Sequence, residues 1–410
     1  MKILYFSQWF GTSDTAGGSG RPYDISKYMV QAGHQVYVIC GVPFGVKPAP
    51  WYKLFKNEII DGINVVSCNV IYKPKFGFFR RAWSFIRFSV LATLAIYFVK
   101  KPDIIFASST PLTIGIPGYL AAKFKRAPFV FEVRDIMPEA FVESGALKPG
   151  PTIWLAERLE AFIYAKAVRI MVVSPGFKKR LVERGLPAEK FRVSPLGADG
   201  NMFLNVKPDE GFLDKYNLRG KKIAIYTGAH GRANGLDYVI KAAECSKDNP
   251  NIVYVLLGDG GRKEQYKQLA REKGLTNLVF ADSVPKERIP GILAVCNIGL
   301  MILRYYGLPR PVLPNKIFDY MFMGIPSIVN FYGPTKEMVE EIGCGVFADP
   351  EKPQELADKV QMLINNPQIC RQMGEKGKKV AWEKYDRKSL ANDVLGIFEE
   401  VITDWQNRKN

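Results

Sequence analysis

The sequence predicts an α/β protein made of two doubly wound, Rossmann-like domains, and three observations support this prediction. The chain has 410 residues, about two to three times the usual length of one domain. Hydrophobic residues make up 47% and charged residues 24%, an ordinary globular composition that lets each domain bury a core. Short apolar runs alternate with longer helical stretches, which is the pattern of parallel sheets covered by helices.

Five apolar runs predict the strands of an N-terminal domain, which we place at residues 1–200. They are rich in β-branched or aromatic side chains and span residues 3–6, 36–39, 104–107, 129–133 and 170–173. Between the first two runs lies a glycine loop that contains Gly17 and Gly18. Ligands of open α/β sheets bind at the carboxyl ends of strands, so we expect this loop to face a ligand.

Positive charge is concentrated in the first half of the chain. Residues 1–200 hold 27 Lys and Arg against 14 Asp and Glu, a net charge of +13. The remaining residues hold 30 against 26, a net charge of +4, which gives the total of +17. We therefore expect an anionic partner to meet the N-terminal domain.

Residues 62–102 form a basic, aromatic segment that contains no acidic residue. Its uninterrupted apolar run is shorter than the ~20 residues that span a bilayer. The pattern predicts an amphipathic helix at about 76–101 that lies in the membrane interface. The alternative is a core helix whose basic ends are solvated. No nucleic-acid partner is expected, because no binding motif accompanies the charge. The predicted contacts with membrane or acceptor are Arg80, Arg81, Trp83 and Arg87.

Two charged residues, Arg134 and Asp135, come directly after the strand predicted at 129–133. Charged side chains at the carboxyl end of a strand tend to face the ligand crevice, so both are catalytic candidates. The alternative interpretation is an ion pair that braces the loop.

Polar residues without periodicity at 201–220 predict an interdomain linker. A second domain is expected at 221–380, and it opens with a strand at 222–227. The strand is followed by a glycine loop that contains His230 and Arg232. A glycine loop between a strand and a helix is a common anion-binding arrangement, whereas His230 is expected to be structural. The last residues, 381–410, predict a helix.

The segment at residues 314–326 predicts a short helix that opens beneath a loop. Pro314 and Asn315 form a turn signal, and Gly324 ends the helical pattern. Free backbone N–H groups at the helix start, together with the charge of Lys316, would suit a phosphate, and Asp319 lies one turn further on. An ordinary amphipathic helix is the alternative.

Several kinds of site are not expected in this chain. The six cysteines are scattered and the only histidines are His34 and His230, which argues against a histidine metal site or a Ser–His–Asp triad. No Asp-x-Asp motif occurs, so a metal-clamped diphosphate would lack its usual ligands. We expect no metal and no other cofactor. The first apolar run resembles a strand rather than a secretory signal, so a cytosolic protein is expected.

The chain resembles the glycosyltransferases of family 4 over essentially its whole length. The strongest match is 314–326, which is similar to the family's Pro-Ser/Asn-Lys-x-Phe-Glu-Tyr-Met-x-x-Gly-x-Pro motif, with Asp319 in place of Glu. The glycine loop near Gly17 and the segment around Lys286 match other family features. The resemblance implies the GT-B fold, in which two Rossmann-like domains flank a cleft and a C-terminal helix crosses back to the first domain. It assigns the acceptor to the N-terminal domain and the nucleotide sugar to the second.

The resemblance also implies a reaction and a set of roles. The reaction is metal-independent sugar transfer from a nucleotide sugar, with retention of anomeric configuration. Arg232 and Lys316 would stabilise the leaving diphosphate with the loop at Gly17 and Gly18, and Asp319 would reach the ribose. The implied donor contacts are Gly17, Gly18, Arg232, Lys286, Pro314, Asn315, Lys316 and Asp319. Arg134 stands where many members have His, and Asp135 is a candidate acceptor base.

The sequence departs from the family pattern at three further positions. Ala229 and Asn234 replace a usual Arg and Lys, and Pro311 stands where the first Glu of a Glu-x7-Glu pair would fall. A missing carboxylate suits a deoxy or amino-deoxy sugar, and the chain resembles the subgroup that transfers N-acetylated amino-deoxyhexoses in surface polysaccharides. A lipid-linked saccharide acceptor at the inner membrane face and a UDP-linked donor are expected.

Two other functions remain open at this point. A UDP-sugar 2-epimerase of similar architecture would convert its donor without an acceptor, and would have no use for the basic aromatic helix. A catalytically silent subunit that binds nucleotide and membrane would account for Ala229, Asn234 and Pro311.

Overall fold

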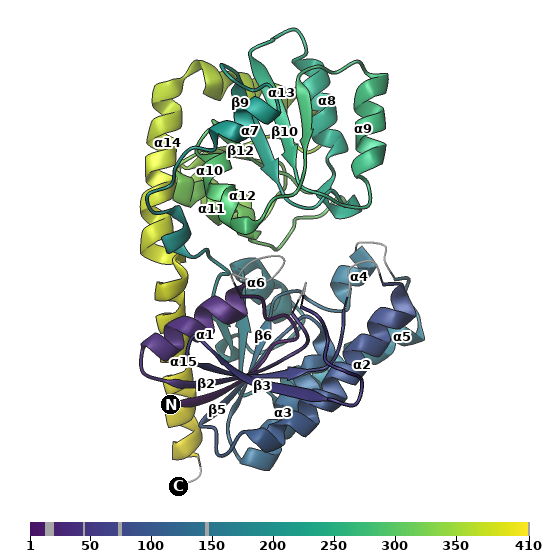
Figure 1. Ribbon diagram of the computed structural model, residues 1–410, viewed down its shortest axis with the longest axis vertical. Helices are drawn as coiled ribbons and strands as arrows, with labels where there is room; N and C mark the ends of the chain where they lie inside the picture. Colours follow the sequence, from purple (N-terminus) through teal and green to yellow (C-terminus); the bar gives the residue numbers. More distant parts are fainter. Residues whose placement is uncertain (13–19, 44–45, 73–75, 144–146, 409–410) are drawn as a thin grey trace. The chain divides into compact units, whose positions relative to one another are not determined.

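The computed structural model of the chain divides into two compact units (Figure 1). It describes residues 1–12, 20–43, 46–72, 76–143 and 147–408. Unit 1 comprises Met1–Pro195 and Arg387–Asn410, and unit 2 comprises Leu196–Asp386. Each unit is built around its own sheet. The glycine loop residues Gly17 and Gly18 lie outside the described residues.

Unit 1 contains an eight-stranded sheet in the order β3-β4-β2-β1-β5-β6-β7-β8. All neighbouring pairs are parallel except β3 with β4. The five runs predicted as strands are all strands of this sheet. Its strands are β1 (Lys2–Phe6), β2 (Gln35–Cys40), β3 (Phe55–Ile60), β4 (Ile63–Cys68), β5 (Ile104–Ser108), β6 (Phe129–Val133), β7 (Arg169–Val172) and β8 (Phe191–Val193).

Helices cover both faces of this sheet. On one face, α1 and α15 pack against side chains such as Tyr5 and Phe106, and the rings of Phe106 and Phe398 lie 5.2 Å apart. On the other face, α2, α3 and α5 lie side by side (Figure 1). The helices of unit 1 are α1 (Arg21–Gln31), α2 (Phe78–Ala95), α3 (Gly115–Lys125), α4 (Glu139–Glu143), α5 (Pro151–Lys166), α6 (Pro175–Glu183) and α15 (Arg387–Asn407).

Unit 2 contains a six-stranded parallel sheet in the order β11-β10-β9-β12-β13-β14. Its strands are β9 (Lys222–Thr227), β10 (Ile252–Leu257), β11 (Leu278–Ala281), β12 (Ile298–Met301), β13 (Ser327–Val329) and β14 (Gly345–Phe347). The helices are α7 (Glu210–Lys215), α8 (Asp237–Cys245), α9 (Lys263–Glu272), α10 (Ile289–Leu293), α11 (Asn315–Met323), α12 (Pro334–Ile342), α13 (Pro353–Asn365) and α14 (Pro367–Val380), with the short 3-10 turns η5 (Arg232–Asn234) and η6 (Lys286–Arg288) between them.

The structure differs from the sequence prediction at the expected linker, residues 201–220. These residues belong to unit 2, which begins at Leu196. They form a 3-10 turn (Gly200–Phe203) and α7, and both Phe212 and Leu218 are buried in the core beneath β9. Elements this short complete too few turns to show a helical period, which is why the segment looked irregular.

The predicted terminal helix at 381–410 is in fact divided between the units. Ala381–Tyr385 form a π-helical turn that belongs to unit 2, whereas α15 begins at Arg387 and belongs to unit 1. The carboxylate of Asp24 pairs with Arg387 in the interior of unit 1. The C-terminal helix thus completes the core of the first unit, as the GT-B fold implies.

Candidate functional site

The predicted helix at residues 314–326 is α11, and its first turn is open. Pro314 has an extended conformation (φ −69°, ψ 145°), and no described side chain caps the helix that starts at Asn315. The helix ends at Gly324, whose φ of +66° places it in the left-handed region. Leading N–H groups of an uncapped helix are available to an anion, and the helix dipole favours negative charge there.

Tyr320 fixes the position of α11 beneath the sheet of unit 2. Its buried hydroxyl lies 3.2 Å from both the amide nitrogen and Oγ1 of Thr227, the last residue of β9. The same hydroxyl lies 3.4 Å from the carbonyl oxygen of Leu300 in β12. A Cβ at Gly299 would come within 2.4 Å of the Tyr320 ring. These contacts hold the start of α11 near the carboxyl end of β9.

Lys316 lies against the end of β9. Its Nζ is 3.6 Å from the centroid of the Tyr226 ring, within the range of a cation–π contact. A Cβ at Gly228 would approach this Nζ to 3.0 Å, and Gly228 has a φ of +140° that favours glycine. Desolvation lowers the pKa of Lys316 to about 7, against the opposing effect of Asp319. An incoming phosphate would stabilise the charged ammonium.

The loop after β9 is packed closely against the loop after β10. A Cβ at Gly258 would lie 1.9 Å from the carbonyl oxygen of Gly228, and a Cβ at Gly260 would lie 2.7 Å from the backbone of His230. The amide of His230 donates to the carbonyl of Asp259 at 2.9 Å. Glycine is required here because two backbones touch, so the loop beside Lys316 has little freedom to move.

His230 is fully buried within this loop. Its ring centroid lies 6.3 Å from those of Tyr226 and Phe280. Burial lowers the pKa of His230 to about 4, and neither ring nitrogen has a hydrogen-bond partner among the described residues. A neutral side chain enclosed by rings fits the structural role expected for His230.

Arg232 is an exposed residue at the start of η5, in the same loop. Its carbonyl oxygen accepts a hydrogen bond of 2.9 Å from Nε of Arg304, which also pairs with Asp237 at the start of α8. Gly235, with a φ of +59°, leaves room for the Arg304 backbone, because a Cβ there would lie 2.8 Å from its Cα. Arg304 therefore supports the predicted phosphate loop. The sequence alone did not indicate this role, since a lone arginine after a strand carries no motif.

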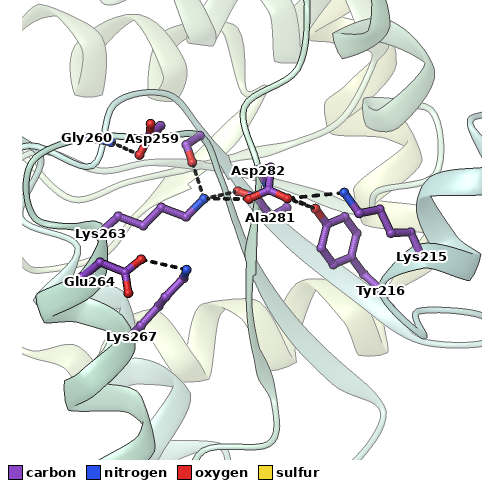
Figure 2. A network of polar contacts seen from close by, with 10 residues as sticks. Lys215, Tyr216, Asp259, Gly260, Lys263, Glu264, Lys267, Ala281 and Asp282 are labelled. Carbon is purple, nitrogen blue, oxygen red and sulfur yellow. Dashed lines mark hydrogen bonds and ion pairs between the residues drawn. The ribbon is translucent and has the colours of Figure 1, made fainter.

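A polar network ties together the loops that follow β10 and β11 (Figure 2). Lys263 of α9 donates from Nζ to the carbonyl oxygens of Gly258 at 2.9 Å and Ala281 at 3.1 Å. The same ammonium lies 3.3 Å from Asp282, which Lys215 also contacts at 3.3 Å. Lys286, the predicted donor contact, follows on η6 and is partly buried.

In unit 1, the predicted pair Arg134 and Asp135 follows β6, next to the end of β5. The amide of Arg134 donates to Oγ of Ser109 at 3.0 Å. The exposed carboxylate of Asp135 accepts from Oγ1 of Thr110 at 3.2 Å. Among the described residues neither Arg134 nor Asp135 forms an ion pair, so the bracing ion pair considered as the alternative is not observed. The carboxylate stands at the carboxyl edge of the sheet, accessible to solvent.

A buried ion pair lies behind this edge. Arg21, which follows the glycine loop, contacts Glu132 of β6 at 3.0 Å, and both side chains are about 1% exposed. Arg21 also donates to the carbonyl of Pro195 at 2.6 Å, and Glu132 accepts from Ser108 at 2.5 Å. The pair was not predicted, because each residue looked like an ordinary charge beside a motif.

The predicted membrane helix is α2, followed by a 3-10 turn (Ile96–Phe98). Arg80 and Arg81 are exposed, Trp83 is 64% exposed and Arg87 is partly buried. Large apolar side chains recur along one exposed side of the helix. The members of this apolar stripe are Phe79, Trp83, Ile86, Val90, Leu94 and Tyr97. Within the described ranges, no helix has the length and apolar character needed to cross a bilayer.

No group of three or more His, Cys, Asp or Glu side chains that could hold a metal ion occurs among the residues that the structure describes. The cysteines of these residues are all free.

Two family models match the chain. The model for glycosyl transferases group 1 matches residues 211–380, and that for a glycosyl transferase 4-like domain matches residues 17–197. The first match lies in unit 2, and the second lies in unit 1 except for its last two residues.

Curated relatives agree with these models. WcaI of Escherichia coli K12, provisionally named a colanic acid biosynthesis glycosyl transferase, is 23% identical over 97% of this chain and 100% of its own. The alpha-D-kanosaminyltransferase of Streptomyces kanamyceticus is 23% identical over 60% of this chain and 64% of its own.

Solved structures show the same fold. HepE of Anabaena in complex with UDP superposes with a TM-score of 0.71 and 19% identity, covering 98% of this chain and 100% of its own. A sucrose-phosphate synthase from Thermosynechococcus elongatus superposes with a TM-score of 0.75 and 15% identity, with the same coverage.

Proposed function

The chain belongs to the group 1 glycosyl transferases of family 4 and has the GT-B fold, and on that premise we propose a specific transfer reaction. A sugar moves from a nucleotide sugar to a lipid-linked saccharide acceptor in surface polysaccharide biosynthesis. The observation that carries the proposal is the position of Lys316, whose ammonium stands between the Tyr226 ring and Gly228 at the open start of α11. A cation, an uncapped helix start and a glycine loop are the parts of a diphosphate site.

Unit 2 holds the donor in this proposal. The diphosphate lies at Pro314, Asn315 and Lys316, with Arg232 of the neighbouring loop as a second cation. Asp319 reaches the ribose and Lys286 contacts the donor from η6. The UDP complex of HepE and the name of WcaI support a UDP-linked donor and a polysaccharide pathway. An N-acetylated amino-deoxyhexose is the proposed sugar, because Pro311 supplies no carboxylate at that position.

The proposed mechanism retains the anomeric configuration and uses no metal. The bond between the anomeric carbon and the diphosphate oxygen breaks, and the acceptor hydroxyl forms a new bond to that carbon from the same face. The acceptor proton passes to the leaving diphosphate. Lys316 and Arg232 stabilise the negative charge that develops on the leaving diphosphate. Such electrostatic stabilisation of the transition state is commonly the largest single contribution to catalysis. In unit 1, Asp135 accepts from or orients the acceptor hydroxyl, with Arg134 beside it.

Unit 1 meets the membrane in this proposal. The apolar stripe of α2 is exposed, and Arg80, Arg81 and Arg87 lie on the same helix. Apolar side chains with flanking cations are the features of a helix that lies in an anionic interface. The proposed location is the cytoplasmic face of the cell membrane, with the protein bound peripherally.

A donor screen tests the proposal. UDP-, GDP- and dTDP-sugars are incubated with a membrane lipid extract, with and without EDTA, and the lipid fraction is analysed for added sugar by mass spectrometry. Transfer from a UDP-sugar that persists in EDTA is expected, with the donor's anomeric configuration retained in the product. Lys316→Gln should lose most of the transfer, whereas Lys241→Gln, an exposed lysine on α8, should not.

The other outcomes separate the alternatives. Loss of transfer in EDTA would overturn metal independence. Conversion of the donor sugar without any acceptor would identify an epimerase, and UDP binding without transfer from any donor would identify a silent subunit.

A further inference from the structure

A hollow of about 330 Å³ lies in unit 1 where α2 begins. Its walls are the loop at residues 48–51, the exit of β4 at residues 69–71 and one face of α2. Trp51, Trp83, Arg80 and Arg87 line it. The hollow lies within the size range of small-molecule sites, roughly 300 to 1,000 Å³.

The walls of this hollow are joined by hydrogen bonds. The buried side-chain amide of Asn69 donates to the carbonyl oxygens of Ala49 at 2.9 Å and Lys53 at 3.0 Å, which fixes the loop that carries Trp51. On the opposite wall, Oγ of Ser84 in α2 donates to the carbonyl of Ile71 at 3.1 Å. The hollow is therefore a built feature of the fold rather than a gap between loose side chains.

Two cations line the hollow without a carboxylate to neutralise them. The guanidinium of Arg80 lies 4.3 Å from the centroid of the Phe76 ring, which orients it. Arg87 follows two turns later on the same side of α2 and also lines the hollow. Neither arginine forms an ion pair with a described residue, and residues 62–102 contain no acidic residue. Two arginines without counter-ions favour a phosphate, which accepts charge-assisted hydrogen bonds from both.

Apolar surface adjoins these cations. The stripe of α2 passes from Trp83, at the rim of the hollow, along the helix to Val90 and Leu94. Beside it, Ile86, Val90 and Leu94 of α2 face Ile116 and Leu120 across a shallow groove toward α3. A ligand with a hydrocarbon chain next to a phosphate fits these two surfaces, because its phosphate can contact the arginines in the hollow and its hydrocarbon chain can contact the apolar surface beside them.

The hollow also lies at the carboxyl edge of the sheet, which carries Asp135, the residue proposed to contact the acceptor. Strands β4, β2, β1, β5 and β6 are parallel neighbours, so their carboxyl ends share one edge. Residues 69–71 follow β4 and line the hollow, while Asp135 follows β6. A ligand held at Arg80 and Arg87 is therefore on the same side of the sheet as Asp135.

We infer that this hollow binds the phosphate that joins the hydrocarbon chain to the saccharide in the acceptor lipid. Arg80 and Arg87 hold the phosphate, Trp51 and Trp83 flank it, and the chain leaves along the apolar side of α2. The identity of the lipid as the acceptor rests on the proposed function, whereas binding of an alkyl phosphate does not.

Isothermal titration calorimetry with farnesyl phosphate, farnesol and inorganic phosphate tests the binding directly. Farnesyl phosphate should bind more tightly than either of the other two. Arg87→Gln and Arg80→Gln should each weaken it by about 10- to 100-fold, the loss that follows when one charge-assisted hydrogen bond is removed. Arg87→Lys should restore part of the affinity. Lys100→Gln, an exposed basic residue beyond the end of α2, is the matched control and should bind as the parent protein does.

If inorganic phosphate binds as tightly as farnesyl phosphate, the hydrocarbon chain contributes nothing to binding and the inference is wrong. If farnesol binds as tightly as farnesyl phosphate, the arginines contribute nothing and the inference is also wrong. Vesicles of phosphatidylcholine with 20% phosphatidylglycerol then separate this site from general attraction to anionic surfaces. If Arg80→Gln and Lys100→Gln lose vesicle binding equally and farnesyl phosphate binding is unaffected by either, the arginines only steer the protein to the membrane and the inference is wrong.

Transfer assays keep this inference distinct from the proposed function. Arg87→Gln should lose transfer to the lipid acceptor while it retains UDP binding by unit 2. A parent protein that binds farnesyl phosphate but transfers no sugar would contradict the proposed function alone.

Discussion

At the scale of the residue, Lys316 combines a charge-dependent role with an unusual environment. Its pKa is lowered to about 7 by desolvation, so the free protein loses this proton through neutral pH. A diphosphate stabilises the ammonium and raises its pKa, which links binding to proton uptake. The affinity for nucleotide diphosphate should therefore fall as pH rises above 7.

We expect the dissociation constant of UDP to increase by roughly 25-fold between pH 7.5 and pH 9, because the protonated fraction of Lys316 in the free protein falls by about this factor when its pKa is about 7. The phosphates of UDP are already ionised in this range, because their second pKa is near 6. Calorimetry in buffers of different ionisation enthalpy should also detect proton uptake on binding. Lys316→Arg should bind with little dependence on pH, and an unchanged slope in that variant would contradict the assignment.

Gly228 offers a second test at this scale. A Cβ at Gly228 would come 3.0 Å from Nζ of Lys316, and its φ of +140° disfavours other residues. Gly228→Ala should weaken UDP binding, because the ammonium must move away from the loop. Gly274→Ala is the matched control: Gly274 has a φ of +61° but a Cβ there meets nothing within 4 Å. If both variants bind UDP equally weakly, backbone strain of about 1 to 3 kcal/mol rather than displacement of Lys316 is responsible.

Individual residues differ in how far the sequence could predict their surroundings. Lys316 lies in the motif at residues 314–326, from which the sequence predicted its place at a helix start. Arg304 and Glu132 have no such context. The role of Arg304 depends on its ion pair with Asp237 of α8. The role of Glu132 depends on its ion pair with Arg21, which lies more than a hundred residues away in the sequence.

At the scale of the element, α2 shows that the spacing of apolar residues predicts a helix but does not tell which of its apolar sides is buried. The sequence predicted an amphipathic helix with aromatic and basic residues. The structure buries Phe88, Leu91 and Ala92 against the sheet and leaves a second apolar side, including Val90 and Leu94, in solvent. A helix with two apolar sides buries only one of them within its own unit, so the other is available to a membrane.

Substitutions on the exposed side of α2 test its contact with the membrane. Val90→Asp and Leu94→Asp should each reduce binding to anionic vesicles by about tenfold or more, since removal of one buried aliphatic side chain costs roughly 1.5 to 3 kcal/mol. Both side chains are 55% exposed, so the melting temperature should change little. Sedimentation with vesicles measures the effect. Ile369→Asp, at an exposed position on α14 of unit 2, should leave vesicle binding unchanged.

The elements that the sequence did not predict are those that lie beside a polar edge strand or that are too short to show a helical period. The runs that became β1 and β5 are continuous and apolar, as expected of strands buried on both faces. The hairpin of β3 and β4 was missed because β3, at the sheet edge, is largely polar or exposed. The supposed linker at 201–220 contains α7, whose six residues are too few to reveal a period.

At the scale of the whole molecule, unit 1 is built from two segments that are separated in the sequence by the whole of unit 2. Unit 1 is completed by the last helix, α15, after the whole of unit 2 has been passed. Val394 and Phe398 of α15 fill the same core as Tyr5 and Phe106. Unit 1 therefore depends on residues that the chain supplies last.

A truncation tests this dependence. A chain that ends at Asp386 should lose the cooperative unfolding transition of unit 1, because a face of its sheet would be exposed and Asp24 would lose its buried partner. Differential scanning calorimetry should still show a transition for unit 2. Removal of only residues 408–410 is the matched control and should preserve both transitions. Two intact transitions in the longer truncation would show that α15 is dispensable.

By itself, the sequence determined the α/β class, the existence of two sheets and the place of the helix start at Lys316. Each of these depends on short patterns of neighbouring residues, namely apolar runs, glycine turns and the motif at residues 314–326. Tertiary structure alone decided that Tyr226 and Gly228 border Lys316, that Arg304 contacts the loop after β9, and that residues 201–220 belong to unit 2. It also decided that two arginines of α2 share a hollow with the exit of β4. Such contacts join segments far apart in the chain, and their residues show no spacing that a sequence pattern could detect.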